Sequence, residues 1–128
     1  MKSALLVSYR PDLFEMAVAA LRRVSPEVSE AKDCAQMTHS DGRLLTVFGA
    51  PHEETLRSLR EEENIPREGV TAPDMDLVRV CVIECRWEDL FASMVREVAH
   101  AVGEPCWVVD GDGVIWDAAH VDPSLVRL

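Results

Sequence analysis

Residues 77–85 have the sequence LVRVCVIEC, an almost continuous run of apolar side chains. Such a run, bounded by turn-forming residues, is typical of a strand buried on both faces of a sheet. We therefore place residues 77–85 at the centre of a sheet. The rest of the chain can be arranged around this strand.

The clearest helix follows this strand directly. Apolar side chains recur at helical spacing from Trp87 to Val102, and Gly103 provides a stop. The same periodicity predicts a helix over residues 11–24, preceded by a short apolar strand at residues 3–9. Each of these helices thus begins where a strand ends.

A hairpin and a surface helix are expected between these two strand–helix pairs. Strands at residues 34–38 and 44–48 flank the turn-forming cluster at residues 40–43. A helix over residues 51–64 follows, and its apolar side chains do not form a clear stripe. We therefore place this helix at the surface.

A second hairpin is expected over residues 106–117. Gly111 and Asp112 fit a tight two-residue turn between its strands. That register would place Trp107 directly opposite Trp116, and the two indoles would then pack across the hairpin.

These elements predict an α+β fold with an antiparallel sheet and with helices packed mainly on one face. The first six elements, β-α-β-β-α-β, have the order of a ferredoxin-like core, and an α-β-β extension follows at the C-terminal side. An alternative is two βαββ units joined by the surface helix, because Arg10 and Asp12 in one half match Arg86 and Asp89 in the other. The length of 128 residues indicates a single domain over residues 1–128.

The charge balance is strongly acidic. Asp and Glu number 23 against 13 Lys and Arg, which gives a formal net charge of −10. This charge repels phosphate backbones, so we expect no nucleic-acid partner. It would accelerate encounters with a protein that has a basic surface.

The sequence favours a cytoplasmic protein without a membrane span, because no apolar run reaches the length that a span requires. The four cysteines, Cys34, Cys81, Cys85 and Cys106, form no C-x-x-C pair, and we expect them to be reduced. Cys81 and Cys85 lie ~13 Å apart on a strand, too far to share a zinc ion. We expect neither a metal nor a cofactor.

One motif resembles part of a catalytic site. Residues 107–117 place Asp110 and Asp112 after a strand and resemble the first motif of haloacid dehalogenase-type phosphatases. The resemblance implies Asp110 as nucleophile and Asp112 as acid or base. The lysine of such a site has no match at Lys2 or Lys32. We favour a hairpin turn, which also requires Asp and Gly, and we name no catalytic residue.

Two acidic features stand out. Glu61, Glu62 and Glu63 lie near the carboxyl end of the surface helix, where the helix dipole disfavours negative charge. Residues 97–126 contain acids but neither Lys nor Arg. Together these features give an acidic surface with the candidate binding residues Glu61, Glu62, Glu63, Asp110, Asp112, Asp117 and Asp122.

Three functional hypotheses follow. The first is a non-catalytic acidic domain that binds a basic protein, with an immunity-type inhibitor as one concrete form. The second is a small-molecule-binding or small enzyme domain with a site near Glu84, Arg86, Trp87 and His120. The third is a structural subunit whose role is assembly, with the tail or an edge strand added to the sheet of a neighbour. In the second hypothesis the site lies in a cleft or at the interface of a homodimer, since ferredoxin-like domains often pair through their sheets.

Overall fold

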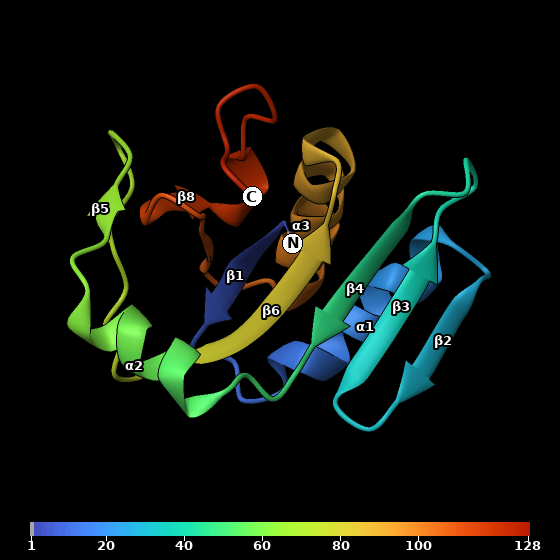
Figure 1. Ribbon diagram of the computed structural model, residues 1–128, viewed down its shortest axis with the longest axis horizontal. Coiled ribbons are helices and arrows are strands. Elements are labelled where there is room, and N and C mark those ends of the chain that lie inside the picture. Colours follow the sequence, from blue (N-terminus) through green and yellow to red (C-terminus); the bar gives the residue numbers. More distant parts are fainter. Residues whose placement is uncertain (1) are drawn as a thin grey trace.

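An eight-stranded sheet organises residues 2–128, the part of the chain that the computed structural model describes (Figure 1). The strand order is β2-β3-β4-β6-β1-β7-β8-β5, and every pair is antiparallel except β5 with β8. In chain order the elements are β1 (Ser3–Ser8), α1 (Leu13–Val24), β2 (Val28–Ala31), β3 (Cys34–Thr38), β4 (Leu44–Phe48), α2 (Glu53–Glu61), β5 (Ile65–Pro66), β6 (Arg79–Cys85), α3 (Glu88–Val102), β7 (Cys106–Val109), β8 (Val114–Asp117) and the 3-10 helix η1 (Ala118–His120).

Strand β6 occupies the centre of the sheet, as its apolar sequence predicts. It pairs with β1 on one side and with β4 on the other. Only one face of β6 is covered along the whole length of the strand. Cys81, Ile83 and Cys85 are buried beneath helices, whereas Val82 and Glu84 on the opposite face remain partly exposed. The expectation of burial on both faces was therefore too strong.

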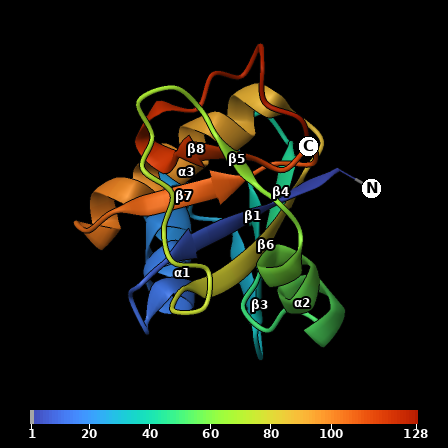
Figure 2. The same cartoon turned by 90° about the vertical axis from the view of Figure 1, so that its left-hand side faces the viewer.

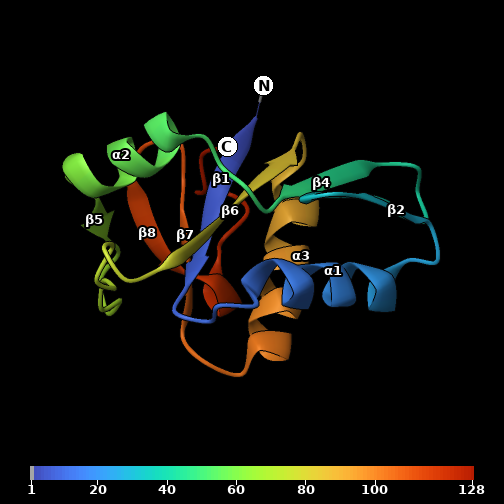
Figure 3. The same ribbon diagram turned by 90° about the horizontal axis from the view of Figure 1, so that it is seen from below.

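The two sheet faces are covered unequally. Helices α1 and α3 lie together on one face, where Phe91, Leu6 and Leu21 belong to the main core (Figure 3). Helix α2 lies on the other face, over the half formed by β1, β7 and β8 (Figures 2 and 3). Its Leu59 packs there in a smaller core with Val7. The half over β2, β3 and β4 has no helix on that side (Figure 3).

The β7–β8 hairpin is present, but its register differs from the expected one. Val109 pairs with Ile115, so Trp107 faces Asp117 and not Trp116. The turn contains one residue more than expected, because Gly113 adopts the left-handed conformation, with φ of 76°, that closes a three-residue loop. The two indoles therefore lie on opposite faces, and Trp107 packs edge-to-face on Tyr9.

The ferredoxin-like arrangement of the first six expected elements is not confirmed. Strand β6 lies between β4 and β1, whereas that arrangement would pair β4 with β1 directly. The two half-chains do not lie side by side either, because β1 is inserted between β6 and β7. The structure supports the coarser description, a mixed and mostly antiparallel sheet with three α-helices.

Candidate functional site

Asp110 is a buried structural carboxylate. Its side chain closes the β7–β8 turn by accepting hydrogen bonds at Oδ1 from the backbone N–H groups of Asp112 and Val114, each at 3.0 Å. Its Oδ2 accepts from the indole N–H of Trp116 at 3.0 Å and from the backbone N–H of Arg127 at 3.2 Å. Both carboxylate oxygens are thus occupied by donors from this chain.

These contacts attach the C-terminal segment to the hairpin. Gly111 donates its backbone N–H to the Arg127 carbonyl, and Val126 is buried beside this contact. A Cβ at Gly111 would lie 3.0 Å from the Arg127 carbonyl oxygen, so a larger residue there would push the two segments apart by a few tenths of an ångström. Asp110 is therefore not part of an acidic surface, which corrects its place among the candidate binding residues. Its environment also does not fit the nucleophile that the phosphatase resemblance implies.

The other acids near the C-terminus also have local partners. Asp117 accepts a hydrogen bond from the Ala119 N–H at 2.9 Å and lies 3.2 Å from Nδ1 of His120. Asp122 accepts from the Ser124 hydroxyl at 2.7 Å, which lowers the pKa of Asp122. An oxygen of Asp112 lies 3.9 Å from Nε of Arg127. Much of the negative charge in this segment thus serves local structure.

The glutamates of α2 behave differently. Glu53 and Glu54 lie in its first turn, Glu61 ends the helix, and Glu62 is its C-cap. Together with Glu63 they are exposed, and none of the five forms an ion pair within residues 2–128. We call these five glutamates the α2 surface.

A groove runs between α2 and the β7–β8 turn. It has a volume of about 390 Å³, and Glu54, Ser58 and Glu62 line its helix side. Leu5, which is partly exposed, and the buried Leu59 and Val109 form its floor. The fold therefore brings the acidic end of α2 against the β7–β8 turn, which belongs to the second predicted acidic feature, residues 97–126. It does not gather all seven predicted acids at one place, because Asp110 is buried and because Asp117 and Asp122 lie at and beyond the end of β8 that is distant from the turn.

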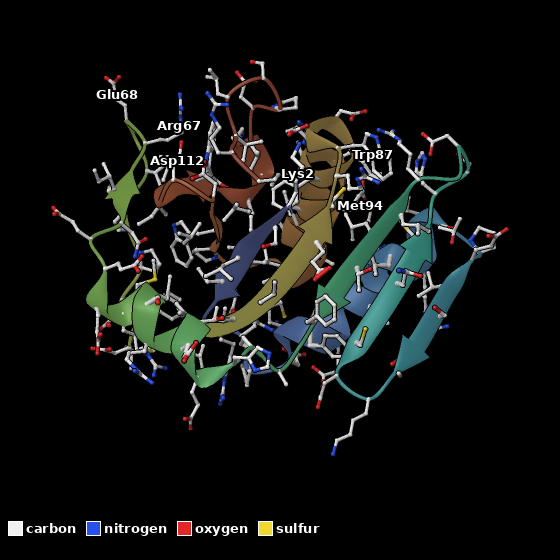
Figure 4. All side chains as sticks on the ribbon, viewed as in Figure 1. Lys2, Arg67, Glu68, Trp87, Met94 and Asp112 are labelled. Atoms are coloured by element: carbon white, nitrogen blue, oxygen red, sulfur yellow. The ribbon has the colours of Figure 1, made fainter. Side chains whose placement is uncertain are left out.

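A second pocket lies at the end of β6. Glu84, Arg86 and Trp87, three of the four residues predicted for a small-molecule site, line it together with Lys2, Leu44, Thr46 and Cys85, and its volume is about 590 Å³ (Figure 4). The fourth residue, His120, lies in η1 beside Asp117 and does not line this pocket.

Lys2 connects the pocket rim to the segment after β6 through one hydrogen bond and one ion pair. Lys2 donates to the Arg86 carbonyl and pairs with Glu88, which lowers the pKa of Glu88. Sequence reasoning missed Lys2, Leu44 and Thr46 because they reach the pocket only through the pairing of β6 with β1 and β4.

None of the comparisons with known proteins identifies a relative: no family model, no curated protein and no solved structure matches the chain. Within residues 2–128, no three His, Cys, Asp or Glu side chains are grouped so that they could hold a metal ion. Over the same residues, no helix has the length and apolar character that crossing a bilayer requires.

We expect Asp110→Asn to destabilise the protein by about 2–4 kcal/mol, because the amide cannot accept all four hydrogen bonds of the buried carboxylate. Thermal or urea unfolding measures the change. Asp112→Asn is the matched control, since this exposed side chain lies 3.9 Å from its single ionic partner, and we expect a change below about 0.5 kcal/mol. Equal effects of the two variants would contradict the role given to Asp110.

We expect thiol reagents to distinguish Cys34 from the other cysteines. Burial raises the pKa of Cys81 and of Cys106 to about 12, and it also raises the pKa of Cys85, whereas Cys34 is only partly buried. Because the thiolate is the reactive form, native protein at pH 8 should show a single fast-reacting thiol. Cys34→Ser should remove this fast phase. Fast reaction of a second thiol in that variant would show that the sheet interior is more accessible than described.

Proposed function

We propose that this protein binds a partner protein with a basic surface, and that the α2 surface makes the contact. The observation that carries the proposal is the set of five exposed glutamates on and after one short helix, none of which has an ion-pair partner within residues 2–128. The acids of the β7–β8 turn and of the C-terminal segment described above contact groups of this chain, whereas these glutamates form no ion pair even with Arg57 or Arg60 of the same helix.

The position of these glutamates in α2 also favours a cationic partner. Glu61, Glu62 and Glu63 follow one another at the carboxyl end of α2, where negative charge is disfavoured by about 0.3–1 kcal/mol per residue. Repulsion between neighbouring carboxylates adds to this cost, as does the net charge of −10. Cations of a bound partner would offset both the unfavourable interaction with the helix dipole and the repulsion between carboxylates. Relief of these costs would add to the binding free energy that the direct contacts supply.

The groove beside α2 suits a long cationic side chain of such a partner. The partly exposed Leu5 offers apolar surface for the aliphatic stem of an arginine, and Glu54 and Glu62 on the helix side of the groove would pair with its guanidinium. Such an arginine would lie near the middle of the contact, which is the position that dominates binding energy in interfaces.

A neutralising protein of the immunity type is the concrete form that we favour. It would cover the basic surface of a toxic enzyme in the cytoplasm. The four free cysteines are consistent with a reducing compartment. Such an inhibitor needs no catalytic residue of its own.

The pocket at the end of β6 supports a second candidate function, the binding of a small molecule. The pocket brings Lys2 and Arg86 together with Glu84 and exposes the indole of Trp87. Groups of both charges beside an aromatic ring would suit a small zwitterion such as an amino acid. A shift in melting temperature on addition of amino acids would support this function, and no shift with any of them would remove it.

We also infer that a ferredoxin-like order exists in a different set of elements. The elements β1, α1, β4, β6, α3 and β7 follow the chain order β-α-β-β-α-β, and their strands lie in the order β4-β6-β1-β7. In this description β2 and β3 are an insertion before β4, and α2 with β5 is an insertion before β6. The α2 surface would then belong to an insertion.

The proposed function predicts a charge-specific interaction. We expect the triple variant Glu61→Lys, Glu62→Lys, Glu63→Lys to lose a basic partner that the wild-type protein captures from its native host, with a loss of affinity of at least about 100-fold. Binding by the wild type should weaken steeply as the salt concentration rises. Pull-down at low and high salt identifies the partner, and calorimetry then measures the affinity.

The matched control reverses three exposed acids that lie elsewhere, Glu27→Lys, Asp76→Lys and Glu104→Lys, and has the same net charge as the triple variant. We expect it to retain most of the affinity. An equal loss in both variants would show that net charge alone attracts the partner, and binding that is insensitive to salt would show that the contact is not electrostatic. Either result would overturn the assignment to the α2 surface.

A further inference from the structure

The sheet face that α2 leaves open carries two rows of side chains that run across the strands. The register of β2, β3, β4, β6 and β1 places the members of each row side by side on this face. The first row is polar and consists of Ser29, Gln36, Thr46, Glu84 and Ser3. The second row is mostly apolar and consists of Ala31, Cys34, Phe48, Val82 and Leu5.

These rows are poor in charge. Glu84 is the single charged residue among the ten, although charged residues make up 28% of the chain. Phe48, Val82 and Leu5 remain partly exposed, and Leu44 beside the rows is 44% exposed. Depletion of charge together with accessible apolar side chains is the composition of an interface core. The open face is therefore poor in charge and partly apolar, whereas the α2 surface is acidic.

We propose that a second copy of this chain covers the open face, with the two sheets packed face to face about a two-fold axis that runs along β4. The face is complementary to itself. A two-fold contact brings the same patch of both copies together, so each row must match its own reverse. Because β4 is the middle strand of the five, rotation about it places β3 opposite β6 and β2 opposite β1 of the second copy. Each row then faces itself in reverse order.

In the polar row, rotation about β4 places Gln36 opposite Glu84 of the second copy. The Gln36 amide has two N–H donors, and one of them bonds to the Thr46 hydroxyl at 3.0 Å within the chain. The other is available to the carboxylate of the second copy. The single charge of the face would thus receive a hydrogen bond at each of its two symmetric positions.

In the mostly apolar row, Phe48 lies on the axis and meets Phe48 of the second copy. Cys34 then faces Val82, and Ala31 faces Leu5, so that small side chains meet larger ones. Face-to-face packing of two sheets interdigitates their inner side chains in this way. Helix α2 stands over the β1, β7 and β8 half and leaves room beside it for the second sheet (Figure 3).

Salt separates this contact from the proposed partner binding. Two copies with a net charge of −10 each repel one another, so added salt should strengthen the dimer. The same salt should weaken a contact between the α2 surface and a basic protein. Failure of one proposal is therefore distinguishable from failure of the other.

The test is sedimentation equilibrium of the full chain over a range of concentrations. We expect a monomer–dimer equilibrium, a weakening of at least about tenfold in Phe48→Arg, and no change in Ile65→Arg, whose side chain is exposed outside the face. Gln36→Glu alters an exposed residue and should keep the fold. It should weaken the dimer by a similar factor, because it places a second carboxylate opposite Glu84 of the other copy.

A crosslinking measurement locates the axis. In a Cys34→Ser background, a short bis-maleimide should join two copies through Thr46→Cys, which lies on the axis, and not through Ile65→Cys. A chain that stays monomeric at millimolar concentration would overturn the proposal. A dimer that is unaffected by Phe48→Arg and Gln36→Glu would overturn it as well, because the copies would then meet through another surface.

Discussion

The antiparallel pairing of β1 with β6 is the contact on which the rest of the structure depends. Six residue pairs, from Ser3 with Glu84 to Ser8 with Arg79, join the two strands at the middle of the sheet. Each strand then presents one side chain in two to the helix layer, where Leu6 and Ile83 are fully buried. Because β4 and β7 pair with the outer edges of these strands, an error in this pairing would displace both pockets and the open face.

Unequal covering of the two faces links this sheet to function. One face is closed by α1 and α3, whereas the other is closed only where α2 and the segment before β6 lie. The proposed interactions both use what this arrangement leaves accessible. Helix α2 buries only Leu59 within its own length and so exposes its glutamates, and the uncovered half of the sheet exposes a charge-poor patch. The two halves of one face therefore differ in surface chemistry, and Leu5 lies at the border between them.

Local sequence patterns predicted the elements more reliably than their pairing. The apolar run of β6, the stripe of α3 and the turn between β3 and β4 all lie where periodicity and turn residues indicate. The partners of Asp110 could not be predicted, because the Arg127 N–H reaches it from 17 residues away and the hairpin register depends on the conformation of Gly113. Strand β2 was missed because three of its four residues are exposed at the sheet edge and have no alternating pattern. Glu84, Arg86 and Trp87 line one pocket because they are neighbours in sequence, whereas His120 lies in η1 outside that pocket.

Amide hydrogen exchange tests the central role of the β1–β6 pairing most directly. If this pairing holds the sheet together, the amides of Leu6, Val7 and Ile83 should exchange only through global unfolding, and their opening free energy should equal that of unfolding by urea. The amides of the edge strand β2 should exchange much faster, by local opening. Exchange in β1 or β6 that is as fast as in β2 would contradict the account, because the sheet would then be held by other strands.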